Sequence, residues 1–122
     1  MARSTNLIIK LTVGAQEAEK VAQAFSVATT ALASGIKVSF WLTGEASWFA
    51  MPGKASEFSL PHSAPLDQML ESLIAGGTVT LCTQCAVRRS INDGDQIEGI
   101  RIAGAASFVE EIMGESTQAL VY

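Results

Sequence analysis

Short runs rich in Val, Ile, Leu and Thr alternate along this chain with segments in which apolar residues recur every three or four positions. The first pattern is typical of β-strands and the second of amphipathic α-helices. The strand pattern predicts five strands, at Asn6–Val13, Lys37–Leu42, Thr78–Leu81, Gly99–Ile102 and Gln118–Tyr122. The helical pattern predicts four helices between them, at Gln16–Ser34, from Pro65 to the glycine pair at 76–77, at Thr83–Arg89 and at Ala105–Met113.

Strands joined by helices are expected to pair in parallel, because a parallel pair needs a long crossover and the crossovers here are helical. The alternation therefore predicts an α/β fold, with a five-stranded, mostly parallel sheet between two helical layers in a flavodoxin-like α/β/α arrangement. At 122 residues the chain is long enough for one such domain, over residues 1–122, and too short for a second. Sites in these folds lie outside the carboxyl ends of the strands.

The second predicted strand is closed by Thr43-Gly44. The connection that follows, Gly44–Ala64, interrupts the regular alternation of strands and helices. Loops between a strand and a helix are usually about two to six residues long, and this one is far longer. We predict a short helix at Glu45–Met51. The rest is expected to be a loop that covers a site or packs on a neighbouring subunit.

Composition narrows the function classes. With 48% hydrophobic and 16% charged residues, the chain is not a disordered one. Twelve acidic against eight basic residues argue against binding to nucleic acid, which needs a basic surface. The longest uncharged runs, Val21–Ile36 and Ser72–Val87, are shorter than the roughly 20 apolar residues of a membrane-spanning helix. Lys10 interrupts the first apolar stretch, so we expect no signal peptide, no membrane partner and a cytoplasmic location.

Both cysteines of the chain, Cys82 and Cys85, fall where the third predicted strand gives way to a helix. A helix N-terminus favours an anion, so a thiolate is favoured at Cys82, and this arrangement makes a sulfur nucleophile. Cys85 lies one turn further on and could be an auxiliary or resolving thiol. Arg88 and Arg89 either stabilise the thiolate or form solvated or intersubunit ion pairs. His62 is either a loop-borne base or hydrogen-bond donor to the thiolate, or an exposed polar residue without a role.

Three other interpretations of the cysteine pair remain open. The two residues could be small hydrophobic filler, which is the common role of a free cysteine. They could form a redox dithiol, because the Cys-x-x-Cys spacing suits an internal disulfide at a helix N-terminus. They could bind a zinc ion shared between subunits, although four ligands are needed and His62 is the only histidine. We predict no metal and, without a GxGxxG motif or a P-loop, no nucleotide cofactor.

The residues after Cys82 resemble a motif of a known family. Cys82 followed by Arg88-Arg89-Ser90-Ile91 is similar to the Cys-x5-Arg-Arg-Gly-Val/Ile segment of DsrE/TusD-type sulfur carriers, in the DsrE/DsrF-like superfamily. Three further segments agree with that superfamily, and they extend the resemblance over nearly the whole chain: Thr12-Val13-Gly14, Gly35–Phe40 and Ile102–Phe108.

The resemblance implies an α/β/α protein that assembles into trimers, hexamers or mixed oligomers and carries sulfur as a cysteine persulfide. Cys82 falls at the sulfur-accepting cysteine of the carriers, and Arg88 and Arg89 match their arginine pair. Ser90 replaces a glycine and Cys85 a small residue of the carriers, which leaves a Cys82–Cys85 disulfide open. The implied partners are a sulfur donor or acceptor protein or a small thiol. The leading hypothesis is a persulfide acceptor or thiol redox protein; the alternatives are a non-catalytic ligand-binding or assembly module and a dithiol oxidoreductase.

Overall fold

The computed structural model of the chain describes residues 4–122 and contains a five-stranded sheet with the strand order β4-β3-β2-β1-β5. Every neighbouring pair of strands is parallel, so the predicted α/β fold with a mostly parallel sheet is confirmed. The strands are β1 (Asn6–Leu11), β2 (Lys37–Leu42), β3 (Thr78–Cys82), β4 (Ile100–Ala103) and β5 (Thr117–Val121).

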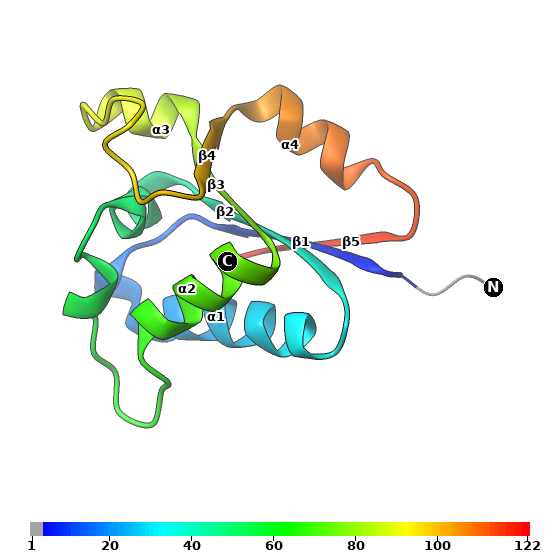
Figure 1. The fold of residues 1–122 in the computed structure, drawn as a ribbon, viewed down its shortest axis with the longest axis horizontal. Helices are drawn as coiled ribbons and strands as arrows, with labels where there is room; N and C mark the ends of the chain where they lie inside the picture. The colour runs from blue at the N-terminus through cyan, green and yellow to red at the C-terminus, as the bar shows by residue number, and fades with distance from the viewer. Residues whose placement is uncertain (1–3) are drawn as a thin grey trace.

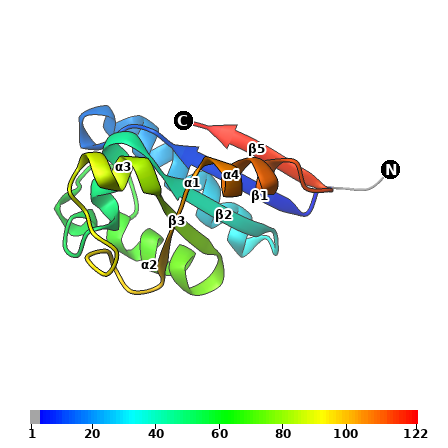
Figure 2. The same cartoon turned by 90° about the horizontal axis from the view of Figure 1, so that it is seen from above.

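Four α-helices connect the strands and complete the predicted three layers: α1 (Ala18–Ala33), α2 (Leu66–Gly76), α3 (Thr83–Arg88) and α4 (Ala105–Ile112). Helices α1 and α2 lie together below the sheet in Figure 1, and α3 and α4 lie above it. Seen from above, α4 crosses the sheet near β1 and β5, while α3 lies at one end of the strands (Figure 2). Among residues 4–122, none of the helices combines the length and the apolar character that crossing a bilayer requires.

The long connection after β2 contains two short 3-10 helices, η2 (Gly44–Ala50) and η3 (Ala55–Glu57). The short helix predicted at Glu45–Met51 is therefore present, in the tighter 3-10 form and shifted by one residue. Phe49 is 5% exposed, and its ring packs edge-on against Phe25 of α1 and against Phe58. The connection is thus anchored in the core of the protein through its aromatic residues.

The two faces of the sheet differ in chemistry because successive side chains of a strand point to opposite sides. The face under α1 and α2 is apolar and forms the core, with Ile9, Leu11, Phe40, Leu42 and Leu81 all fully buried. The α4 face carries polar or amphipathic side chains at the alternate positions: Lys10, Ser39, Trp41, Thr80 and Arg101. Parallel strands are usually apolar on both faces, so this sheet has one dry core rather than two.

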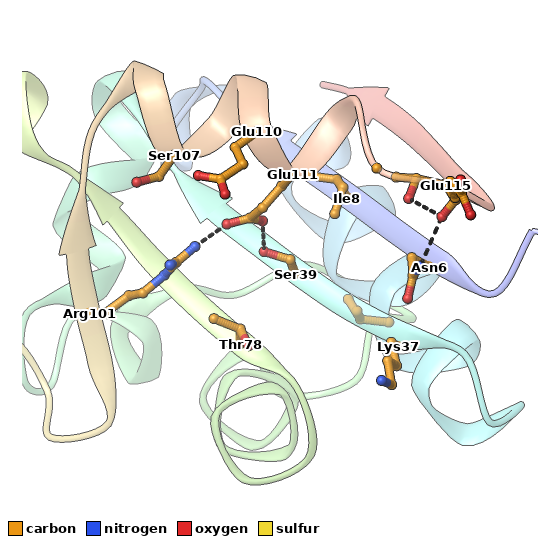
Figure 3. A pocket seen from close by; sticks show the side chains of 13 residues that line it. Asn6, Ile8, Lys37, Ser39, Thr78, Arg101, Ser107, Glu110, Glu111 and Glu115 are labelled. Atoms are coloured by element: carbon orange, nitrogen blue, oxygen red, sulfur yellow. Dashed lines mark hydrogen bonds and ion pairs between the residues drawn. The ribbon is translucent and has the colours of Figure 1, made fainter.

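A polar network holds α4 to the sheet. Glu111 of α4 accepts hydrogen bonds from Ser39 Oγ at 2.5 Å and from Trp41 Nε1 at 3.2 Å, and it forms an ion pair with Arg101 (Figure 3). Arg101 Nε in turn donates to the fully buried Thr80 Oγ1 at 2.6 Å. The network lines an open cleft of about 590 Å³, which lies near the starts of the strands. Charge-assisted hydrogen bonds thus hold α4 against the sheet, whereas apolar burial holds α1 and α2 against it.

We expect Glu111→Gln to lower the free energy of unfolding by about 1–2 kcal/mol, because it removes the partner of Arg101 and one acceptor charge from the network. Glu110→Gln is the matched control, because Glu110 is the exposed neighbour on the same helix and should change stability by less than about 0.5 kcal/mol. Urea unfolding of both variants measures the difference. Equal stabilities of the two variants would show that the network does not hold α4.

Candidate functional site

The two cysteines lie at the carboxyl end of β3. Cys82 is the last residue of the strand and the N-cap of α3, with an extended backbone at φ −64° and ψ 129°. Thr83 begins the helix, as the sequence pattern predicts. Cys82 keeps the extended backbone of the strand and Thr83 is already helical, so the chain changes from strand to helix between two residues, without a glycine or proline. The cysteines therefore stand at the end of the sheet where α/β folds place their sites.

The two thiols differ in exposure and lie one helical turn apart. Cys82 is partly exposed, whereas Cys85 is buried at 8% exposure. Both are free thiols, three residues apart at the start of α3. A reagent in solution therefore meets Cys82 first.

Gly44 supplies a backbone contact to the buried thiol. It follows β2, the neighbour of β3 in the sheet, and its N–H donates a hydrogen bond to Cys85 Sγ at 3.2 Å. Gly44 has a positive φ of 52°, and a Cβ atom at this position would lie 2.5 Å from the carbonyl oxygen of Thr12. Both facts require glycine here. The sequence pattern indicates Thr43-Gly44 only as the end of a strand, so this donor is a residue that sequence reasoning missed.

The surroundings of Cys85 favour its thiolate. Burial raises the pKa of Cys85, but the Gly44 N–H and the Cys82 side chain lower it by hydrogen bonding. The positive charges of Arg89 and Arg88 lower it further, and the net result is a pKa below the ordinary value of a cysteine. At neutral pH a larger fraction of Cys85 is therefore ionised than for an unperturbed thiol.

The two arginines have different environments. Arg89 ends α3, donates to the carbonyl oxygen of Cys85 at 3.1 Å, and forms an ion pair with Glu45 at 2.8 Å. Arg88 is exposed. Arg89 thus has an ion-pair partner within its own chain, and the role of the two arginines toward a thiolate stays a prediction. Glu45 belongs to η2, so this ion pair ties the long connection to the cysteine helix, and it is a second contact that local patterns could not indicate.

His62 lies away from the cysteines. It has a left-handed backbone with φ 63° and lines a shallow pocket together with α1 residues such as Glu19 and Gln23. The loop around it lies on the α1 and α2 side of the sheet, and α3 lies on the other side (Figure 1). The structure thus corrects the interpretation of His62 as a base or donor for the thiolate, because the connection must cross to the α1 side to enter α2.

Within residues 4–122, no three His, Cys, Asp or Glu side chains form a group that could hold a metal ion.

We expect Gly44→Ala to lower the free energy of unfolding by about 2–4 kcal/mol, because the new methyl group meets a carbonyl oxygen and the residue is held at positive φ. Gly53→Ala is the matched control, because Gly53 also has positive φ but faces open space, and its cost should be about 1–2 kcal/mol. Urea unfolding measures both.

The same Gly44→Ala variant should raise the pKa of Cys85, because the donor to its sulfur is displaced. Alkylation of Cys85, followed by peptide mass spectrometry, should then reach its half-maximal rate at a higher pH than in the wild type and in Gly53→Ala. Identical pH profiles in the three proteins would contradict the assigned role of Gly44.

Comparison with known proteins places this arrangement in context. The chain is 29% identical over 104 residues to the uncharacterized protein MJ0760 of Methanocaldococcus jannaschii. The match covers 84% of this chain but only 38% of that protein, so the chain spans less than half of the length of this relative.

Two solved structures share the fold over almost the full length. The ychN protein from E. coli superimposes with a TM-score of 0.72 at 18% identity, covering 98% of this chain and 99% of that one. The protein of unknown function MTH1491 from Methanobacterium thermoautotrophicum gives a TM-score of 0.67 at 10% identity, covering 96% and 98%. A model of the DsrE/DsrF-like family matches residues 6–119. The chain therefore belongs to the DsrE/DsrF-like family.

Proposed function

We propose that this protein is a thiol-based sulfur carrier in which Cys82 accepts a sulfur atom as a persulfide. The observation that carries the proposal is the pairing of a partly exposed thiol, Cys82, with a buried thiol, Cys85, one helical turn away at the carboxyl end of a parallel sheet. Membership of a family related to sulfur relay supports it. The sulfur donor and acceptor would be a partner protein or a small thiol.

The chemistry needs a thiolate at the exposed position. The Cys82 thiol loses its proton to solvent, and Cys85, with its lowered pKa, stays available as a second thiolate. The Cys82 thiolate then attacks the terminal sulfur of a donor R–S–SH. The sulfur–sulfur bond of the donor breaks, R–S⁻ leaves with the electron pair, and Cys82–S–SH remains. Transfer to an acceptor thiolate repeats the same exchange in the opposite direction.

Mass spectrometry tests this proposal directly. After incubation with one equivalent of a persulfide donor under non-reducing conditions, Cys85→Ser should carry one additional sulfur atom on the Cys82 peptide, and Cys82→Ser should carry none. The two variants are matched controls, because each retains one thiol of the same pair. A folded Cys85→Ser protein without added sulfur would overturn the carrier proposal.

The alternative, a ligand-binding or assembly module with inert cysteines, is favoured only by the burial of Cys85. Thiol titration of the native protein separates the two functions. A carrier has one thiol that reacts rapidly near neutral pH, and it should map to Cys82. Inert filler would resist modification at both positions until the protein unfolds.

We further propose that the protein is a cytoplasmic homo-oligomer, a trimer or a hexamer. On the α4 side of the sheet, α4 with its C-cap and the adjacent strand β5 expose apolar side chains, which are between 53% and 77% exposed: Val109, Met113 and Val121. A second copy that covered this surface would remove it from water. A cytoplasmic location suits two free thiols three residues apart, because that compartment keeps thiols reduced.

We expect Met113→Asp to shift the protein towards monomers in light scattering coupled to size-exclusion chromatography, because it places a charge at the most exposed apolar side chain of this surface. Val87→Asp is the matched control, because Val87 is 71% exposed but lies on α3, and it should leave the mass unchanged. If the wild type is monomeric at high concentration, the oligomer proposal is wrong.

A further inference from the structure

A sulfur carrier needs one accepting thiol, but this site has two. Cys82 and Cys85 are three residues apart across the start of α3, a spacing that places neighbouring side chains on one face of a helix. This Cys-x-x-Cys spacing at a helix N-terminus is compatible with an internal disulfide. A persulfide formed on Cys82 would therefore be made beside a second sulfur nucleophile.

The surroundings assign different roles to the two thiols. Cys85 is 8% exposed, and its sulfur is held by the Gly44 N–H at 3.2 Å, so an external donor meets Cys82 and not Cys85. Arg89 binds the carbonyl oxygen of Cys85 and the carboxylate of Glu45, which fixes this turn of the helix against η2. Sulfur is therefore loaded at Cys82, and Cys85 remains a free nucleophile behind it.

We propose that the site does not only carry sulfur but reduces it: Cys85 displaces the sulfur bound to Cys82 and releases it as hydrosulfide. This activity rests on the proposed function, because it begins from the Cys82 persulfide. The substrate class is a persulfide of a protein or of a small thiol, and the product is hydrosulfide.

The step balances within the chain. The Cys85 thiolate attacks Sγ of Cys82 in Cys82–S–SH, and the bond between Sγ and the terminal sulfur breaks. The terminal sulfur leaves as HS⁻ with the electron pair, and a Cys82–Cys85 disulfide forms. The transferred sulfur is reduced by two electrons, and the two thiols are oxidised by two. A second turnover needs a dithiol reductant, such as dithiothreitol or a protein dithiol, which returns the disulfide to two thiols.

Three physical features favour the attack of Cys85 on the Cys82 persulfide. Hydrosulfide is a good leaving group, because thiol–disulfide exchange is faster when the leaving sulfur is the less basic one. The attacking sulfur has a lowered pKa, so it is available as a thiolate without a separate base. The reaction is also intramolecular, which removes the entropy cost of bringing a second thiol to the persulfide.

A single-turnover experiment on the full chain tests the inference. The fully reduced wild-type protein, freed of small reductants, is mixed with one equivalent of cysteine persulfide. We expect about one hydrosulfide per chain, a protein mass lower by two hydrogen atoms, and a Cys82–Cys85 disulfide in the peptide map. Cys82→Ser gives the background of hydrosulfide from the donor alone. Cys85→Ser should keep the added sulfur on Cys82 and release hydrosulfide no faster than that background.

The outcomes separate this inference from the carrier proposal. If the wild type keeps the persulfide on Cys82 as Cys85→Ser does, without a disulfide, the inference is overturned and the carrier proposal stands. If neither protein takes up sulfur and the wild type forms no disulfide, the carrier proposal fails and the inference fails with it. A wild type that keeps its persulfide overturns the inference whether or not Cys85→Ser folds, and the added sulfur on Cys85→Ser identifies the persulfide route when the wild type forms the disulfide.

Discussion

The parallel register of β1, β2 and β3 is the constraint on which the candidate site depends. Leu11 is aligned with Leu42, and Leu42 with Leu81, so the residues that follow these three strands meet at one end of the sheet. There the carbonyl oxygen of Thr12 leaves no room for a side chain at residue 44, which is a glycine. The backbone N–H of Gly44 can therefore approach the sulfur of Cys85. A shift of one residue in either pairing would separate the donor from the sulfur and turn every core side chain to the wrong face.

Structural features that a few neighbouring residues determine could be predicted from the sequence. The bounds of β2 and the junction at Cys82 were predicted as the structure has them, because a period of two and a change to helical period are visible over a few residues. The contacts of Gly44 and of Glu45 with the cysteine helix were missed, because they join segments about forty residues apart. The sequence left His62 open between a donor to the thiolate and an exposed residue without a role, since it does not indicate on which face of a sheet a long loop runs.

The one-sided core gives the two helical layers different kinds of stability. Helices α1 and α2 lose apolar surface to a dry interface, whereas α4 has no fully buried residue and is attached by Glu111, by the edge contact of Phe108 with Trp41 and by Lys10 above the Phe108 ring. Attachment of this kind weakens with salt and opens at lower cost than apolar burial. The cysteine helix stands on the α4 side at one end of the sheet and is held instead through η2 by the Glu45–Arg89 pair.

Strand β5 completes the sheet from the far end of the chain. Its neighbour in the sheet is β1, the first strand. The hydrogen bonds between the two strands continue to Tyr122, whose N–H donates to Lys10 O and whose carbonyl oxygen accepts from Thr12 N–H, each at 2.9 Å. During synthesis β1 emerges first and β5 after the other four strands, so one row of hydrogen-bonding groups of β1 has no partner until translation of this region is nearly finished. The nascent protein therefore exposes an open strand in the middle of its future sheet, where a chaperone or a neighbouring nascent chain can pair with it.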